Sequence, residues 1–187
     1  MILLDGLEFA TKHLLASQQA NWQGTGRIVS ADQRNGGFAM STLGSSTCTM
    51  GELVDRAIRR FGDRPAIVDG KSKLTYRQLG ARISQYKSAF AALGLKNGDA
   101  VGVLVTNTIE AYSVMAAAIC MGVRYTALHP MGILDDHLLI VGDAEIDMLI
   151  VEPTAYAARI EPLSKACKIA TLGPSEGHTD ISALADQ

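Results

Sequence analysis

The sequence has no paired cysteines and little excess charge. Its three cysteines, Cys48, Cys120 and Cys167, lie far apart and form no C-x-x-C pair, which favours reduced, inert thiols over a disulfide framework. The net charge is only -2, so no basic surplus points to a nucleic-acid partner. Hydrophobic residues make up 48% and charged residues 19% of the chain, and this composition favours a folded globular protein over a disordered one.

A long hydrophobic run is also missing. The longest run near the middle covers residues 115–123, far short of the roughly 20 residues that cross a bilayer. The apolar start of the chain meets Asp5, Glu8 and Lys12 too early for the core of a secretory signal. We therefore expect no membrane span and a cytoplasmic protein.

Several motifs that carry chemistry are missing as well. Neither G-x-G-x-x-G nor G-x-x-x-x-G-K-[ST] occurs, and the nearest match, residues 24–26, lacks a third glycine and a preceding strand. The sequence also has no G-x-S-x-G nucleophile elbow. Residues 135–137 (Asp-Asp-His), with His129 upstream, are of the types that bind metals. Because both acids fall in the first turn of a predicted helix, where the helix dipole favours negative charge, we expect them to be structural and assign no metal site.

The chain divides into three parts of different composition. Apolar residues at roughly helical spacing predict a short helix near the N-terminus, and residues 18–46 are rich in the polar and small residues of linkers. We therefore divide the chain into an N-terminal extension (1–48), an α/β subdomain (49–175) and a C-terminal connector (176–187) in which one short helix fits. An anchoring or partner-binding helix and an extension that packs on the domain or stays loose both stay open.

Caps and turns mark the first half of the central part. Thr49 and Glu52 have the spacing of a capping box, and Thr75 is placed to cap a second helix. Asp69 and Gly70 predict a tight turn between two short strands. The expected elements are a helix over 51–61, a hairpin with strands over 65–68 and from 73, and a helix over 76–93.

Strands and helices alternate in the second half. Residues 99–106 form an apolar run rich in β-branched residues, typical of a strand buried on both faces of a parallel sheet. The alternation predicts right-handed crossovers, and therefore an α/β fold with a mainly parallel sheet and helices on both faces. The strands are expected over 99–106, 123–128, 147–151 and 168–172, and the helices over 108–121, 134–142 and 155–166.

His129 and Pro130 end one of these strands. Ligands of open α/β sheets bind at the carboxyl edge of the strands, so His129 is the one residue that we predict to lie beside a substrate. The alternative is a strand-end histidine that bonds nearby backbone, with Pro130 stopping the strand.

Three segments together resemble the N-terminal part of the adenylate-forming superfamily, which includes acyl-CoA synthetases, luciferases and adenylation domains. Residues 74–79 (Leu-Thr-Tyr-Arg-Gln-Leu) match its first core motif, and residues 101–122 resemble its next strand and helix. Residues 118–130 resemble its second core motif, and residues 128–137 are most similar to bacterial fatty-acyl-CoA ligases. The order of these segments, rather than any one of them, makes the resemblance specific.

The resemblance covers roughly residues 50–175 and implies structural roles for Thr75, Tyr76, Gly122 and Pro130. Enzymes of this family join a carboxylic acid, here most similarly a fatty acid, to ATP with Mg²⁺ and pass the acyl group to a thiol such as coenzyme A. Their phosphate loop, their adenine and ribose motifs and their catalytic lysine lie later in the chain. We therefore assign no catalytic, cofactor-binding or metal-binding residue here, and expect this chain alone to bind no ATP, Mg²⁺ or coenzyme A and to be inactive.

Two other hypotheses stay open. The chain is alternatively a stand-alone, non-catalytic binding or assembly module of the same fold, which would use an unpaired sheet edge or its leading helix to join a partner or a second copy of itself. The remaining hypothesis is an unrelated nucleotide-binding protein with the same alternation of strands and helices, for which the sequence offers no phosphate loop.

Overall fold

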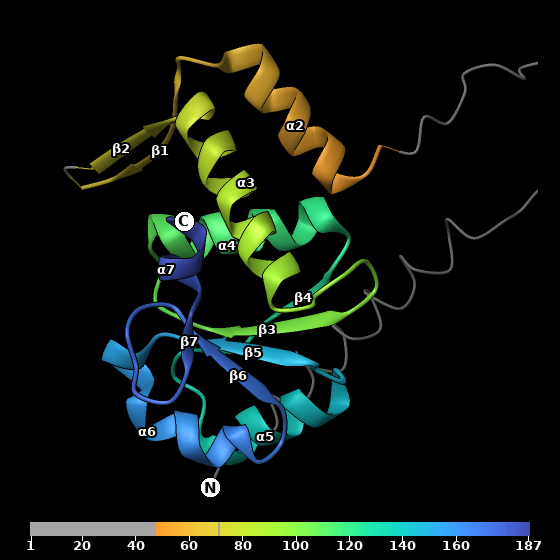
Figure 1. Ribbon diagram of the computed structural model, residues 1–187, viewed down its shortest axis with the longest axis vertical. Helices are drawn as coiled ribbons and strands as arrows, with labels where there is room; N and C mark the ends of the chain where they lie inside the picture. The colour runs from red at the N-terminus through yellow and green to blue at the C-terminus, as the bar shows by residue number, and fades with distance from the viewer. Residues whose placement is uncertain (1–47, 71) are drawn as a thin grey trace, which may run out of the picture. The chain divides into compact units, whose positions relative to one another are not determined.

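The computed structural model describes residues 48–70 and 72–187, so the predicted N-terminal extension lies, except for Cys48, outside the described residues. Figure 1 shows helices stacked above and below a central sheet, with a separate hairpin beside them. The helices are α2 (Met50–Phe61), α3 (Tyr76–Ala92), α4 (Ile109–Met121), α5 (Leu134–Asp143), α6 (Pro153–Ser164) and α7 (Ile181–Ala185). The strands are β1 (Pro65–Asp69), β2 (Ser72–Thr75), β3 (Ala100–Leu104), β4 (Arg124–Ala127), β5 (Met148–Val151), β6 (Lys168–Thr171) and β7 (Thr179–Asp180).

The central sheet has five parallel strands in the order β4-β3-β5-β6-β7. Every residue of β3 and β5 is buried, because helices cover the sheet on both sides. This confirms the prediction drawn from the apolar run at 99–106. The antiparallel pair β1-β2 forms a sheet of its own, as the Asp69-Gly70 turn predicts.

Two clusters of apolar side chains hold the layers together. Helices α3, α4 and α7 pack on one face of the sheet, around the fully buried Tyr86 and Phe90. Helices α5 and α6 pack on the other face, around Leu149 and Leu163. The α/β class, the parallel sheet and the helices on both faces are therefore confirmed. Within the described part of the chain, no helix is both long and apolar enough to cross a membrane.

Capping boxes start the first two described helices. The backbone N–H of Thr49 donates to Glu52 Oε2 at 2.8 Å, while Glu52 N–H donates to the Thr49 hydroxyl at 3.2 Å. Thr75 and Gln78 repeat this exchange at the start of α3. Both predicted caps are therefore confirmed, and they explain why these helix starts could be located from the sequence.

The C-terminal residues contribute more than a connector to the sheet. Thr179 and Asp180 form β7, which pairs with β6, and Ile181 of α7 is completely buried. The Asp180 carboxylate accepts from Gly173 N–H at 3.0 Å and from Ser182 N–H at 2.8 Å. This side chain therefore caps α7 and holds the preceding loop, so residues 179–185 are part of the folded core. The short helix was expected, but the fifth strand was not.

Candidate functional site

The loops that follow β3, β4, β5 and β6 meet at one edge of the sheet, on the left in Figure 1. After β3 the chain crosses to β4 through α4 on one face, and after β4 it crosses to β5 through α5 on the other face. The connections therefore diverge beside β3 and β5. In open α/β sheets a crevice at such a switch point is the usual ligand site, so this edge is the first place to look for function.

Glu152 spans the switch point between β3 and β5. Its carboxylate accepts from the backbone N–H of Thr106 at 2.7 Å and from the Thr106 hydroxyl at 2.6 Å. It also accepts from the Thr154 hydroxyl at 3.0 Å. Partial burial would raise the pKa of Glu152, but these hydrogen bonds outweigh burial and hold its pKa below the ordinary value. Glu152 is therefore a charged tie between two loops, and its only signal in the sequence is an acid directly after a buried strand.

Glu152→Gln should destabilise the fold at neutral pH and should matter less as the pH falls. Because the pKa of Glu152 is lowered in the folded state, its carboxylate contributes stability above the unfolded pKa of about 4.3, and this contribution is lost as the pH falls through the folded pKa. Urea unfolding of both proteins at pH 7 and at about pH 3.5 would show a gap that narrows on acidification. A gap of constant size would contradict this role.

His129 lies in the loop after β4, at the predicted edge. Its ring is exposed, and Nδ1 accepts a hydrogen bond from the Met131 N–H at 3.1 Å. Its Nε2 makes no hydrogen bond within the described residues. The histidine is therefore accessible to a ligand at the same edge as Glu152, while one of its nitrogens supports the local turn.

His137 of α5 contacts the same loop through its imidazole ring. Its Nε2 lies 2.9 Å from the carbonyl oxygen of His129, and because a carbonyl can only accept, Nε2 carries the proton. A side chain on Gly132 would bring a carbon to 2.6 Å from this nitrogen. Asp135 and Asp136 occupy the first turn of α5, as expected, and no cluster of three metal-binding side chains occurs in the described ranges. The hydrogen bond of His137 to the His129 carbonyl therefore ties this loop to α5.

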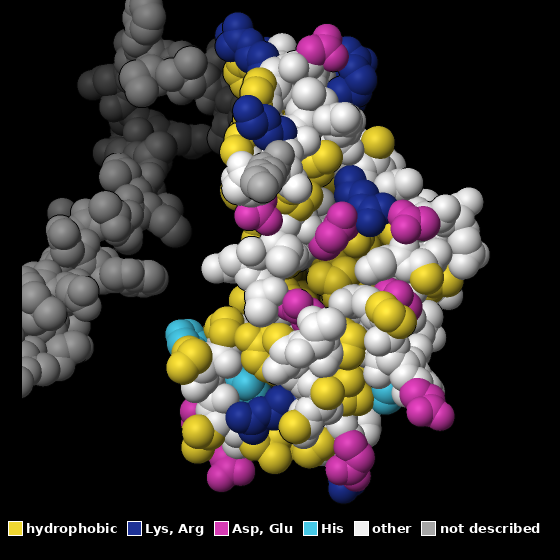
Figure 2. Space-filling view, turned by 90° about the vertical axis from the view of Figure 1, so that its left-hand side faces the viewer, with side chains coloured by type: hydrophobic (Ala, Val, Ile, Leu, Met, Phe, Trp, Pro, Cys, Tyr) yellow, Lys and Arg dark blue, Asp and Glu magenta, His cyan; other side chains and the backbone are white. Residues whose placement is uncertain are grey.

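An apolar hollow of about 410 Å³ opens beside β4. Figure 2 faces the edge of the sheet that lies on the left in Figure 1, and hydrophobic side chains gather in its middle and lower part. The large hydrophobic residues that are exposed in the described chain include Val68 of the hairpin, Tyr112 of α4, and Met131 and Ile133 of the loop after β4. The hollow is lined by Ile67, Val68, Asp69, Val103, Val105, Asn107, Thr108, Ala111, Tyr112, Met115, Tyr125, Ala127, Leu128 and Pro130.

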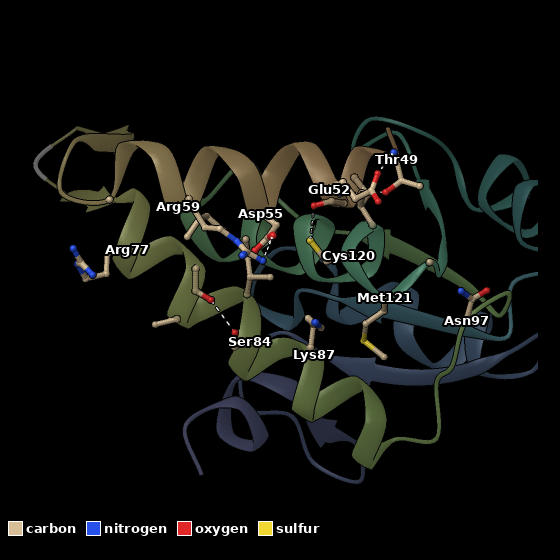
Figure 3. A pocket seen from close by; sticks show the side chains of 18 residues that line it. Thr49, Glu52, Asp55, Arg59, Arg77, Ser84, Lys87, Asn97, Cys120 and Met121 are labelled. Carbon is tan, nitrogen blue, oxygen red and sulfur yellow. Dashed lines mark hydrogen bonds and ion pairs between the residues drawn. The ribbon is translucent and has the colours of Figure 1, made fainter. Parts of the chain in front are cut away.

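A larger groove, of about 820 Å³, lies between α2, α3 and the end of α4. Figure 3 shows the ion pair between Asp55 and Arg59 and the thiol of Cys120 in this groove. Burial raises the pKa of Cys120, so its thiol is a poor nucleophile at neutral pH. The groove shares no lining residue with the hollow beside β4, and burial leaves its cysteine thiol unactivated, so the carboxyl edge is the better candidate site.

The two core motifs that resemble the adenylate-forming superfamily contribute residues with structural positions. Thr75 caps α3, and the ring of Tyr76 lies 5.5 Å from that of Phe61. Gly122 ends α4 with φ of 70°, and a side chain there would bring a carbon to 2.6 Å from Asn97 Nδ2. Only glycine meets both conditions without strain. Pro130 follows β4 in the loop of His129.

Comparisons with known proteins agree with this fold. The family described as "AMP-binding enzyme" matches residues 54–185. A medium/long-chain-fatty-acid–CoA ligase, FadD8 of Mycobacterium tuberculosis, is 40% identical over 129 aligned positions, and the match covers 66% of this chain and 23% of that protein. The luciferase-like enzyme of the mealworm Zophobas morio has a TM-score of 0.68 at 19% identity, over 73% of this chain and 33% of its own. O-succinylbenzoate coenzyme A synthetase of Bacillus subtilis, solved with ATP and magnesium ion, has a TM-score of 0.61 at 16% identity, over 72% of this chain and 33% of its own.

The chain thus spans between about a quarter and a third of the length of these relatives. The structural matches, at under 25% identity, support the fold alone. The match to the mycobacterial ligase covers 66% of this chain at 40% identity.

Proposed function

Because the chain belongs to the AMP-binding enzyme family, we propose that it forms the N-terminal part of a ligase that activates a fatty acid with ATP and transfers it to coenzyme A. The observation that carries this proposal is the 40% identity over 129 residues to a protein named medium/long-chain-fatty-acid–CoA ligase. ATP and magnesium ion are bound in the solved synthetase of the same fold. We infer the same two cofactors for the complete enzyme. The wide spacing of the three cysteines favours reduced thiols, and we propose the cytoplasm as its compartment on that ground, which cell fractionation would check.

In the proposed ligase, this chain would supply part of the structural framework and one wall of the acyl-binding site. Acyl-adenylate formation needs positive charge to stabilise the polyphosphate in the transition state. At the carboxyl edge, Glu152 is tied to Thr106 and Thr154, and no lysine or arginine lines the hollow beside β4. These residues favour a supporting role, and we propose that the chain alone is inactive.

An assay of ATP–pyrophosphate exchange tests this function. The 187-residue chain should show no exchange that depends on a fatty acid. A fusion of the chain to the part of the mycobacterial ligase that follows its matched segment should show it, because the fusion would carry the groups that bind the polyphosphate. The control is that ligase segment alone. Acid-dependent exchange by the chain alone, or none by a folded fusion, would count against the proposal.

We further propose that His129 lies beside the bound acid. This rests on its exposed ring at the carboxyl edge and on the free Nε2 described above. In the active fusion, His129→Ala should raise KM for the acid about fivefold, the value of one lost hydrogen bond, with a smaller change in kcat. Met131→Ala, at an exposed neighbour, should change neither. An unchanged KM in His129→Ala would remove this residue from the site.

A further inference from the structure

The loop that carries His129 is fixed by a side chain of the helix that follows it. His137 of α5 makes a hydrogen bond to the backbone of this loop. We propose that His137 is a positioning residue for the acid, because it keeps the exposed ring of His129 in place at the carboxyl edge of the sheet. This inference rests on the proposed function, since it takes His129 to lie beside the bound acid.

The carbonyl oxygen of His129 accepts two hydrogen bonds. One comes from the backbone N–H of Gly132 and the other from Nε2 of His137, and both are 2.9 Å long. The backbone N–H of His137 also donates to the Ile133 carbonyl at 3.2 Å, at the start of α5. The loop is therefore joined to α5 by a side chain as well as by the chain itself, and this fixes the direction in which the side chain of His129 leaves the backbone.

The ring of His129 is then oriented by the loop that His137 holds. Its Nδ1 accepts from the backbone N–H of Met131 at 3.1 Å. Because a backbone N–H can only donate, Nδ1 carries no proton, and in the neutral ring the proton is on Nε2. An exposed N–H donor of this kind suits the carboxylate of an acid. His137 itself is only 1% exposed, so it acts on the acid through His129 and not by contact.

Gly132 leaves the space that the contact between the two histidines needs. A carbon added to Gly132 would lie 2.6 Å from Nε2 of His137 and 3.1 Å from the carbonyl oxygen of His129. Arg159 of α6 donates to the Gly132 carbonyl at 3.3 Å. Two helices on the same face of the sheet thus support the loop, and the bond from His137 is the one that reaches the residue at the carboxyl edge.

The buried ring of His137 can be replaced without a large loss of stability. Within the described residues its Nδ1 has no hydrogen-bond partner, and a buried polar atom without a protein partner lowers stability. Leucine would remove this atom together with the bond to the loop. His137→Leu should therefore keep the melting temperature of the chain within about 5 °C, which allows positioning to be tested separately from folding.

A double-variant cycle in the active fusion tests whether His137 acts through His129. His137→Leu should raise KM for the acid by up to about fivefold, with a smaller change in kcat, as expected for His129→Ala. The double variant should show the increase of His129→Ala alone, about fivefold and not about twenty-five-fold. An unchanged KM in a folded His137→Leu fusion, or increases that multiply, would overturn the proposal.

Three further variants make the test specific. His137→Gln keeps an N–H donor at a similar distance from the backbone, so KM should return to within about twofold of the unaltered fusion. Leu139→Ala, at an exposed position of the same helix, should leave KM unchanged. Gly132→Ala displaces the same contact without changing a core residue, and it should raise KM even if His137→Leu does not fold. A glutamine variant as impaired as the leucine variant, or an unaffected Gly132→Ala, would contradict the role of the hydrogen bond.

Amide hydrogen exchange in the 187-residue chain provides a readout that does not depend on activity. The amides of Met131 and Gly132 should exchange about tenfold faster in His137→Leu than in the unaltered chain, because the loop opens more often. Unchanged rates would overturn the proposal. Faster exchange, with a fusion that never shows acid-dependent ATP–pyrophosphate exchange, would support the contact and refute the proposed function alone. An active fusion whose KM does not respond to His137→Leu would refute the positioning role alone.

Discussion

Gly102→Val should lower the free energy of unfolding by about 3 kcal/mol. Gly102 is the middle residue of β3, and a carbon added to it would lie 2.8 Å from Leu149 Cδ1 and 3.2 Å from Ile146 Cγ2. These distances are well inside the 3.5–4.0 Å at which carbon atoms attract. Both neighbours are buried, so neither can move aside without displacing the core between the sheet and α5. Urea unfolding measures the loss.

Two control variants test whether the loss comes from the clash at Gly102: a substitution at a different glycine, and a second substitution that removes the clash. Gly142→Ala, in α5 where nothing lies within 4 Å of the added carbon, should stabilise the protein by about 0.5–1 kcal/mol. The double variant Gly102→Val with Leu149→Ala should lose about 1–2 kcal/mol less than the sum of its single variants, because the smaller side chain makes room for valine. Additive losses would show that the clash with Leu149 is not the cause.

The strand that contains Gly102 is one of the elements that the sequence alone could predict. Local signals were sufficient for caps and for strands with long apolar runs, and so Thr49, Thr75 and the strand around Gly102 were assigned correctly. β7 was missed because a strand of two residues, Thr179 and Asp180, has no periodicity of its own. It forms only because β6 offers an edge and because α7 is buried beside it.

The candidate site was harder to predict, because it depends on residues far apart in the chain. The sequence placed His129 at the carboxyl edge by topology alone. For Glu152 it showed only an acid directly after a buried strand, because the partner Thr106 is 46 positions earlier. Glu152 can contact Thr106 only because β3 and β5 are neighbours in the sheet. Nor could the sequence show that His137 donates to the carbonyl of His129, since that contact depends on how α5 packs against the loop after β4.

Glu110→Ala is the second substitution expected to lower the free energy of unfolding strongly, because Glu110 makes contacts between residues far apart in the chain. Glu110, at the start of α4, accepts from Arg82 Nε at 2.9 Å and from the hydroxyl of the fully buried Tyr86 at 2.5 Å. Arg82 also donates to Asp186, next to α7, at 2.5 Å. Burial would lower the pKa of Arg82, but the hydrogen bonds to Glu110 and Asp186 raise it overall. Burial, with the bond to Glu110, also raises the pKa of Tyr86. Glu110 therefore joins α3 to α4 and, through Arg82, to the C-terminal end of the chain.

Removing the Glu110 carboxylate should cost about 2–3 kcal/mol, because it takes away the acceptor of the buried Tyr86 hydroxyl and leaves Arg82 with one carboxylate fewer. Tyr86→Phe removes that hydroxyl, so adding it to Glu110→Ala should cost about 1 kcal/mol less than the sum of the two single losses. Asp55→Ala, which breaks an exposed ion pair with Arg59, should change the unfolding curve little. If the Glu110 and Tyr86 losses simply added in urea unfolding, the hydroxyl would have found another acceptor. Glu110 would then act through Arg82 alone, and amide exchange in α7 should rise at least as much in Arg82→Met, which also loses the bond to Asp186, as in Glu110→Ala.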